Sequence, residues 1–263
     1  MTSAYVTVQR EPGAVAVVTF SRAESMNSFD PKVIGELHRL FRSLLDDVTV
    51  RGIVLTGTGK AFCAGADVRE FEKGVQSGTA VQWVLDATAA LHPLLLEIQE
   101  SPKVFVAALN GVAAGGGLGL ALVADARIAN PQARLAASYF RLGLSPDGGA
   151  TWLMPRLVGF QRARQFFFNN EVMDAEEAFV CGAVDELVPA DKLLPRAIEL
   201  ARTWGAWAAH SRGATKRLLA ASENHDFGTQ LDLERGLIAA AAGTKDFAEG
   251  VTAFRGKREP KFA

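Results

Sequence analysis

The sequence predicts an α/β fold with a parallel sheet, formed as one compact domain with a helical C-terminal appendage. Two observations lead to this prediction. Short β-branched apolar runs alternate with segments of helical apolar spacing as far as about residue 149, a pattern typical of parallel sheets. Beyond that point the strand patterns fade and helical patterns dominate. Because 263 residues can bury one sizeable core, we assign the core to residues 1–200 and a helical region to residues 201–263.

The individual elements follow from local patterns. Apolar runs of strand length occur at residues 14–20, 51–56 and 104–109. Pro31 opens a segment with apolar residues at helical spacing, and the same spacing recurs at residues 80–99 and, after a run of glycines, at 118–123. The later helices are expected at residues 160–168, 175–181, 190–207, 215–221 and 230–241.

Composition excludes several classes of protein. A net charge of −1 provides no overall field to attract nucleic acid or an anionic membrane. The longest apolar stretch, residues 104–124, is interrupted by Asn110 and several glycines, so it falls short of the roughly 18 apolar residues of a membrane span. No secretory signal is evident at the N-terminus. With only Cys63 and Cys181, neither a disulfide framework nor a metal-ligand set is expected, and a cytoplasmic setting is the default.

Two glycine-containing segments follow predicted strands and offer bare backbone near the strand ends. They are residues 61–67 (Ala-Phe-Cys-Ala-Gly-Ala-Asp) and residues 110–117 (Asn-Gly-Val-Ala-Ala-Gly-Gly-Gly). Two amides from such segments can donate to an oxyanion. The alternative is that the glycines serve only turns or close packing. Neither segment matches a phosphate-binding loop.

Five blocks of the sequence together resemble, in order and spacing, those of the crotonase (enoyl-CoA hydratase/isomerase) superfamily. The blocks are residues 21–29, 61–71, 110–121, 142–157 and 254–262. The resemblance implies a spiral of ββα units with a helical C-terminal trimerisation region, assembled as a trimer or a dimer of trimers. It also implies an acyl-CoA thioester substrate, whose coenzyme A enters with the substrate, so that no separate cofactor is needed.

The resemblance also implies roles for individual residues. The two oxyanion donors would be the amides of Ala64 and Gly116. Coenzyme A would contact Met26 and the segment Ala66, Asp67 and Val68, while Phe254 and Lys257 match a C-terminal pair that reaches coenzyme A in its own or a neighbouring subunit.

The chain departs from hydratases of this superfamily at the two glutamates that share the addition of water. Gly119 and Tyr139 stand in their places. The segment at residues 142–149 instead resembles that of phenylacetate-pathway isomerases, whose single acid/base would here be Asp147. One carboxylate can remove a proton and return it elsewhere on the same face, so this is coherent with moving a double bond. The alternative is that Asp147 caps a helix starting at Gly148.

Two other functions remain open. In a dehalogenase branch of the superfamily, a histidine at the position of His92 acts as base while an aspartate matching Asp147 attacks the ring. The Tyr139 hydroxyl could hydrogen-bond Asp147 in either mechanism. His92 could equally be a packed or surface residue. The third function is a non-catalytic acyl-CoA-binding subunit, since both glutamates are lost.

Three further expectations concern the surroundings of the site. Asp67 is expected to cap the helix that begins near Val68. Cys63 is expected to be a small core residue rather than a nucleophile. The acyl pocket is expected along residues 70–95, with Phe71, Val75, Val81, Trp83 and Val84 as candidate lining residues.

Overall fold

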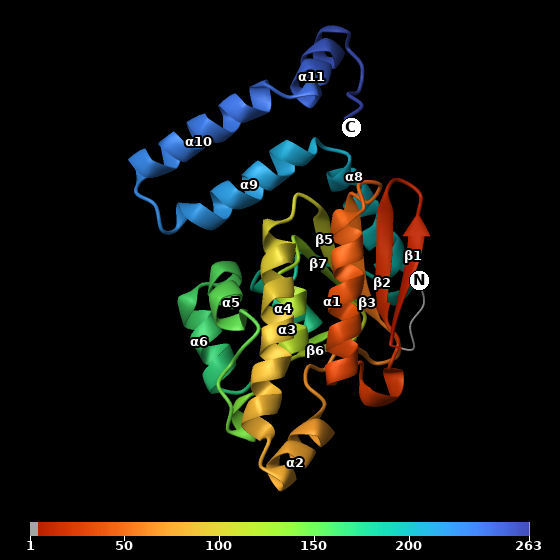
Figure 1. Cartoon of the computed structure of the whole chain (residues 1–263), viewed down its shortest axis with the longest axis vertical. Coiled ribbons are helices and arrows are strands. Elements are labelled where there is room, and N and C mark those ends of the chain that lie inside the picture. The colour runs from red at the N-terminus through yellow and green to blue at the C-terminus, as the bar shows by residue number, and fades with distance from the viewer. Residues whose placement is uncertain (1–4, 263) are drawn as a thin grey trace.

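The computed structural model describes residues 5–262, and its core is built on a six-stranded sheet (Figure 1). In spatial order the strands are β1 (Val6–Glu11), β2 (Val15–Phe20), β3 (Gly52–Gly57), β5 (Val104–Leu109), β7 (Ala126–Ala129) and β10 (Glu186–Leu187). β1 pairs antiparallel with β2, and all the other neighbours pair in parallel. The predicted parallel α/β fold is therefore confirmed.

A second, smaller sheet gives the fold its spiral. Its strands in spatial order are β4 (Ala61–Cys63), β6 (Val112–Ala114), β8 (Arg134–Ala136) and β9 (Val172–Asp174). The chain passes from β3 to β4, from β5 to β6 and from β7 to β8, so each turn adds one parallel strand to each sheet. A helical segment follows each such pair, as the ββα spiral requires.

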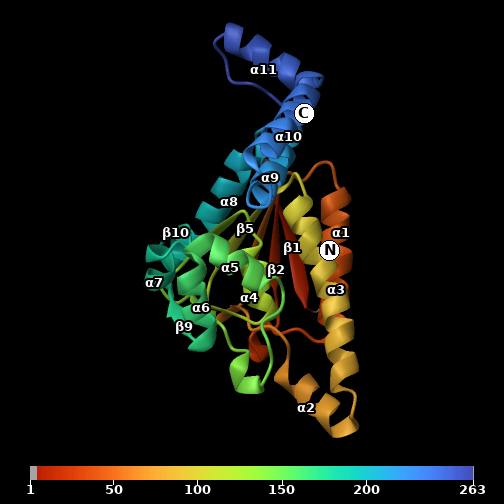
Figure 2. The same ribbon diagram turned by 90° about the vertical axis from the view of Figure 1, so that its left-hand side faces the viewer.

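Helices cover both faces of the larger sheet, as Figure 2 shows with α1 and α3 on one side and α8 on the other. α1 (Pro31–Asp46) and α3 (Ala80–Glu100) pack over the residues of β2 that include Val18 and Phe20. α8 (Leu193–Gly205) packs over the alternate residues, including Val15 and Val17. Successive residues of a strand point to opposite faces, which explains why these strands are apolar throughout.

Shorter helices surround the strand ends: α2 (Val68–Ser77), α4 (Gly116–Leu122), α5 (Ala150–Val158), α6 (Phe160–Phe168) and α7 (Ala175–Val180). Most expected elements agree with the structure to within a few residues. The sequence analysis did not predict β1, the strands β4 and β6 to β10, or the helix α11, and it named only the starts of α2, near Val68, and of α5, at Gly148. Most of these strands have two to four residues, too few for a periodic pattern to be recognised.

Three helices form a C-terminal arm that projects beyond the core at the top of Figure 1: α9 (Ala209–Ser222), α10 (Phe227–Ala242) and α11 (Lys245–Arg255). The expected helices at 215–221 and 230–241 are thus parts of longer ones. The expected division after residue 200 falls inside α8, which still packs on the large sheet. We call residues 209–262 the arm.

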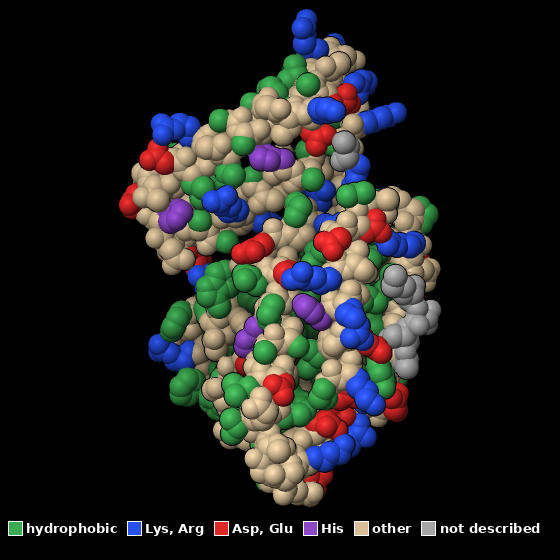
Figure 3. All heavy atoms as spheres, viewed as in Figure 1, with side chains coloured by type: hydrophobic (Ala, Val, Ile, Leu, Met, Phe, Trp, Pro, Cys, Tyr) green, Lys and Arg blue, Asp and Glu red, His purple; other side chains and the backbone are tan. Residues whose placement is uncertain are grey.

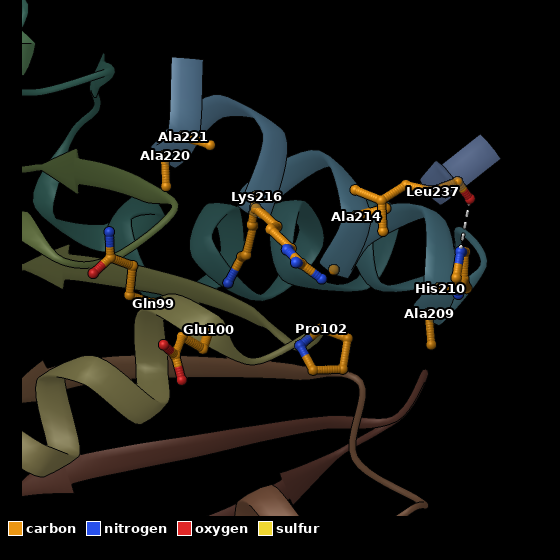
Figure 4. Close-up of a pocket in the computed structure, with 12 residues that line it drawn as sticks. Gln99, Glu100, Pro102, Ala209, His210, Ala214, Lys216, Ala220, Ala221 and Leu237 are labelled. Atoms are coloured by element: carbon orange, nitrogen blue, oxygen red, sulfur yellow. Dashed lines mark hydrogen bonds between the residues drawn. The ribbon is translucent and has the colours of Figure 1, made fainter. Parts of the chain in front are cut away.

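Charged groups attach the arm to the core. The Lys216 ammonium on α9 lies 2.8 Å from the Asp125 carboxylate and donates to the Lys103 carbonyl at 2.9 Å. The Arg212 guanidinium donates to the Pro102 carbonyl at 2.6 Å. Between α9 and the end of α3 lies a cavity of about 780 Å³, where the His210 ring meets the Leu237 carbonyl of α10 (Figure 4).

The surface of the core shows no dominant sign of charge on the face seen in Figure 3, where basic and acidic side chains are interspersed. Of the helices within residues 5–262, none combines the length and the apolar character needed to cross a membrane.

Candidate active site

A cavity of about 550 Å³ opens where the small sheet meets α3 and the loop before α5. Most of its lining comes from the glycine-containing segments, α2, α3 and the loop at residues 138–147, and the rest from Phe29, Ile34, Asn170 and Val172. The lining includes Ala64, Ala66, Val68, Phe71, Trp83, Val84, Leu91, Gly115, Gly116, Tyr139 and Asp147. Most of the residues predicted to carry the chemistry therefore meet at this one place.

The structure revises one of the two predicted oxyanion donors. The Ala64 amide donates to the Met26 carbonyl at 3.0 Å, so its only proton is already bonded. Ala66 lies opposite Phe29 in a parallel bridge whose hydrogen bonds run from Phe29 to the Gly65 carbonyl and from Asp67 to the Phe29 carbonyl. The amide of Ala66 consequently faces away from Phe29. Among residues 5–262 it has no hydrogen-bond partner.

Gly116 supplies the second backbone amide. It is the first residue of α4, where an amide has no acceptor within the helix. Gly65 has a left-handed φ of 81°, and a Cβ on it would lie 2.6 Å from the Ala114 carbonyl and 3.1 Å from the Gly116 nitrogen. This close approach, which only glycine allows, brings the segment of Ala66 beside Gly116. Within residues 5–262, the amides of Ala66 and Gly116 therefore lie side by side without a partner, whereas the amide of Ala64, one of the predicted donors, is already bonded.

Asp147 lies half-buried on the cavity wall. Burial raises the pKa of its carboxyl, and the opposing influences are the positive charge of His92 and a hydrogen bond from Tyr139. The Tyr139 hydroxyl also lies 3.4 Å from the Asp147 carbonyl oxygen, and burial raises the pKa of this phenol. A carboxyl with a raised pKa can both accept and return a proton near neutral pH.

The alternative that Asp147 caps a helix is wrong. α5 begins at Ala150, its N-cap is Gly149, and no side chain bonds to its first turn. Asp147 contributes only its carbonyl, which accepts from the Ala150 amide at 3.1 Å. The carboxyl of Asp147 therefore makes no hydrogen bond to the first turn of α5.

Packing around Gly119 leaves no room for a glutamate at the first of the two hydratase positions. A Cβ on Gly119 would lie 2.2 Å from the Gly148 carbonyl oxygen, so no side chain fits between α4 and the loop. The loop that carries Asp147 therefore occupies the space that a glutamate at residue 119 would need. The second glutamate position, Tyr139, is buried and in contact with the cavity.

His92 is placed near the cavity but not in its wall. It is an exposed residue of α3, next to Leu91, which does line the cavity. Its charge nevertheless acts on Asp147.

Of the residues predicted to contact coenzyme A, some line the cavity and others do not. Ala66 and Val68 line the cavity. Asp67 is buried, and it caps α2 as expected by accepting from the Arg69 amide at 3.1 Å. Its carboxylate also pairs with the Arg69 guanidinium at 2.7 Å, which lowers its pKa, so Asp67 organises the segment from behind. Met26, with a left-handed φ of 55°, is partly exposed outside the cavity lining.

Phe254 and Lys257 lie at the far end of the molecule. Phe254 belongs to α11 and is 87% exposed, and Lys257 follows shortly after that helix. In Figure 1, α11 and α2 lie at opposite ends of the molecule, and α2 contributes to the cavity. Within one chain these two residues are therefore not brought to the site.

The apolar wall of the cavity agrees in part with the prediction. Phe71 and Trp83 line it and meet edge to face with ring centroids 4.7 Å apart, and Val84 lies beside them. Val75 and Val81 are 72% and 76% exposed and do not line it, because they occupy the outer faces of their helices. Cys63 is fully buried, and burial raises the pKa of its thiol to about 12, as suits a core residue.

Besides Thr88 of α3, the sequence analysis did not identify three polar lining residues near β8 and β9: Ser138, Arg141 and Asn170. They belong to turns whose positions depend on how β8 and β9 pair. Sequence motifs carry no signal for such a pairing. The larger cavity beneath the arm (Figure 4) contains no comparable carboxyl with adjoining free amides.

Comparisons with known proteins agree with this geometry. The family model for enoyl-CoA hydratase/isomerase matches residues 10–263. A 1,2-epoxyphenylacetyl-CoA isomerase of Escherichia coli is 35% identical over 249 residues, covering 94% of each chain. A 4-chlorobenzoyl coenzyme A dehalogenase-2 of an Arthrobacter species is 30% identical over 254 residues, covering 96% of this chain and 91% of the dehalogenase. The crystal structure of an enoyl-CoA hydratase from Bacillus anthracis superposes with a TM-score of 0.90 at 30% identity, covering 98% of both chains.

These relatives catalyse three different reactions on one fold, so likeness alone selects none of the three. What they share is the family, its fold and the acyl-CoA thioester. The chain is therefore an acyl-CoA-processing enzyme of the enoyl-CoA hydratase/isomerase family.

Proposed function

We propose that this enzyme moves a double bond within an acyl-CoA, or isomerises a ring joined to it, with Asp147 as the acid and base. The observation that carries the proposal is the pairing of a half-buried Asp147, whose pKa is raised, with a Gly119 that has no room for a side chain. The site thus offers one carboxyl for proton transfer and lacks the pair that hydration uses.

In the proposed reaction the thioester oxygen accepts hydrogen bonds from the amides of Ala66 and Gly116. Asp147 removes a proton from carbon conjugated with the thioester carbonyl, and the electron pair moves onto the oxygen as an enolate. The two amides stabilise that charge. The protonated Asp147 then returns the proton to a different carbon, which completes the shift of the double bond without gain or loss of atoms.

The test is exchange of substrate protons in deuterated buffer, together with migration of the double bond in a 3-enoyl-CoA. We expect Asp147→Asn to reduce both rates by about 10² to 10⁴, the usual contribution of a general base. Asp191→Asn is the matched control, because Asp191 is an exposed aspartate of the 3-10 helix before α8. An Asp147→Asn enzyme with wild-type exchange would refute the proposal.

A second candidate is hydrolysis or dehalogenation, favoured by the position of His92, which is close enough to Asp147 that a protonated imidazole would lower the pKa of that carboxyl. Here the carboxylate would attack an electrophilic carbon and expel its leaving group, and water activated by His92 would release the product. A single turnover in oxygen-18 water distinguishes the two reactions. Label entering Asp147 would support the nucleophilic reaction, and an unlabelled carboxyl after turnover would exclude it.

The third candidate is an acyl-CoA-binding subunit without turnover. It predicts calorimetric binding of acyl-CoA thioesters with no exchange, no isomerisation and no hydrolysis. The free amides of Ala66 and Gly116 and the raised pKa of Asp147 favour a catalytic site over this candidate.

We also propose a homo-trimer, or a dimer of trimers, assembled through the arm. The support is the large exposed apolar side chains there, including Phe227 at 78%, Ile238 at 72% and Phe254 at 87%. In such an assembly Phe254 and Lys257 would reach the site of a neighbouring subunit. Sedimentation of wild type and Ile238→Glu tests this, since a charge in the interface should release smaller species. The absence of a metal or separate cofactor, and a cytoplasmic location, stay predictions.

A further inference from the structure

Three polar side chains on one wall of the cavity have no part in the proton transfer proposed above. Ser138 and Asn170 stand in turns next to β8 and β9, and Arg141 lies in the 3-10 helix Phe140–Leu142. The wall formed by α2 and α3 is apolar and aromatic, with Phe71 and Trp83. The wall that carries the three polar residues also contains Leu142, Leu144 and Val172, so the polar side chains form a local cluster on it.

The pairing of β8 with β9 brings the polar residues together. Ala136 pairs with Val172, and the Ala137 amide continues the ladder by donating to the Glu171 carbonyl at 3.0 Å. Antiparallel register then places Ser138 across from Asn170. Both have a left-handed φ, 52° for Ser138 and 46° for Asn170. Non-glycine residues in this region are strained, and such strain concentrates at functional sites.

Most of the hydrogen-bonding capacity left on this wall belongs to donors, although the Ser138 hydroxyl can also accept. The Asn170 Oδ1 accepts from the Phe140 amide at 3.1 Å, so its Nδ2 is left to donate. Arg141 is exposed and, within residues 5–262, pairs with no carboxylate. In the same range the Ser138 hydroxyl has no hydrogen-bond partner. A guanidinium with neighbouring neutral donors is the arrangement that binds a carboxylate.

We infer that this wall is a subsite for a carboxylate at the far end of the acyl group, so that the substrate is the monothioester of a dicarboxylic acid. The other charged residue lining the cavity is Asp147, which the proposed reaction assigns to proton transfer. The subsite sets Arg141 against the substrate's own negative charge, and the apolar wall of Phe71 and Trp83 holds the carbon chain. The inference rests on the proposed function, because it assumes a thioester at Ala66 and Gly116.

The test compares dissociation constants, measured by calorimetry, for matched pairs of thioesters from four to six carbons: succinyl with butyryl, glutaryl with pentanoyl, and adipoyl with hexanoyl-CoA. In wild type we expect the dicarboxylic member of the best-fitting pair to bind about tenfold more tightly, the effect of one charge-assisted contact. Arg141→Gln should remove this preference while leaving the monocarboxylic thioesters within about twofold of wild type. Arg235→Gln is the matched control, because Arg235 is an 81% exposed arginine of α10.

Asn170→Asp is the sharper variant. It keeps an oxygen to accept from the Phe140 amide but exchanges the donor for a negative charge, so it should reverse the preference. Equal binding within every pair in wild type would overturn the subsite and leave the proposed function standing. Equal weakening of both members by Arg141→Gln would also overturn it, by assigning Arg141 to the coenzyme A portion. If no thioester binds at all, the proposed function fails together with the subsite.

Discussion

Helices α1 and α10 each have 16 residues, yet they differ completely in what they bury. α1 buries Val33, Ile34, Leu37, Phe41 and Leu44 against the large sheet. α10 buries none of its residues, although Phe227 and Ile238 are among them. Helical spacing of apolar residues therefore locates a helix but does not identify the surface that covers it. The core completes its packing within one chain, and the arm does not.

The two regions also differ in what holds them in place. The core elements are joined by ladders of backbone hydrogen bonds and by buried side chains on both faces of the sheet. α9 meets the core chiefly through charged groups on carbonyls, from Lys216 and Arg212. We expect substitutions to have large effects where the core is tightly packed and small or favourable effects in the arm.

The largest effect is predicted for Gly119→Ala in the core. A methyl group at residue 119 would lie 2.2 Å from the Gly148 carbonyl, so α4 or the loop must move. We expect a loss of about 3 kcal/mol in the free energy of unfolding, typical of overpacking, measured by urea denaturation. Because Gly148 adjoins Asp147, kcat should fall as well. If the variant is as stable as wild type, the loop at Gly148 can move at little cost in free energy, and this part of the core is not closely packed.

The attachment of the arm is tested by Lys216→Met. This change leaves the partly buried Asp125 carboxylate with the Phe105 amide as a partner, at 2.8 Å, but without the ammonium that it pairs with. Burial raises the pKa of Asp125, and the charge of Lys216 opposes this effect. We expect a loss of about 2 kcal/mol, below the value for a fully buried pair because both side chains are partly exposed.

The double variant Lys216→Met with Asp125→Asn should recover part of this loss, since it removes the uncompensated charge. Lys192→Met is the control, as its 69% exposed ammonium is 3.6 Å from Asp191 and should matter by less than about 0.5 kcal/mol. If the Lys216 and Lys192 variants are equally stable, the charged attachment of the arm contributes little.

A smaller effect, of opposite sign, is predicted for the stability of Asp147→Asn. The folded state raises the pKa of this carboxyl above its value in the unfolded chain, so ionised Asp147 destabilises the fold at neutral pH. Replacement by asparagine should raise stability at pH 7 by about 1 kcal/mol, or ~2–4 °C in Tm. The gain should shrink as the pH falls from the folded-state pKa towards about 4, where wild-type Asp147 becomes protonated in both states. A pH-independent difference would contradict this linkage.

The sequence predicted helices and strands well where the apolar pattern extends over six or more residues and the apolar side chains pack within the core of the same chain. Strand 104–109 and helix 160–168 agree with β5 and α6 at both ends. Asp147, Tyr139 and Gly116, which the sequence analysis predicted as site residues, line one cavity. They could be predicted because the family resemblance matches them to site positions of proteins with the same fold. β1 was missed because its second half, Gln9, Arg10 and Glu11, contains no apolar residue, so the alternation of Val6 and Val8 is too short to be recognised.

The errors at the site have a common physical origin. Whether Ala64 or Ala66 offers a free amide depends on the bridge to Phe29, a contact between segments far apart in the chain. Ser138 faces Asn170 for the same kind of reason, through the register of β8 on β9. Such pairings are set by the whole fold, and no local pattern encodes them.

The smallest effect is predicted for Gly236→Ala in the arm. It is the same substitution as Gly119→Ala, so the two variants compare the packing of the arm with that of the core. A Cβ on Gly236, in the middle of α10, meets no atom within 4 Å, so the methyl group fits without strain in the single chain. Alanine favours a helix over glycine by about 0.8–1 kcal/mol, so the variant should be more stable than wild type by up to that amount in urea denaturation. If the arm packs against other subunits at this face, the methyl group would instead weaken assembly in sedimentation while the core stays folded. The sign of the change therefore tells whether the exposed side of α10 faces water or another copy of the chain.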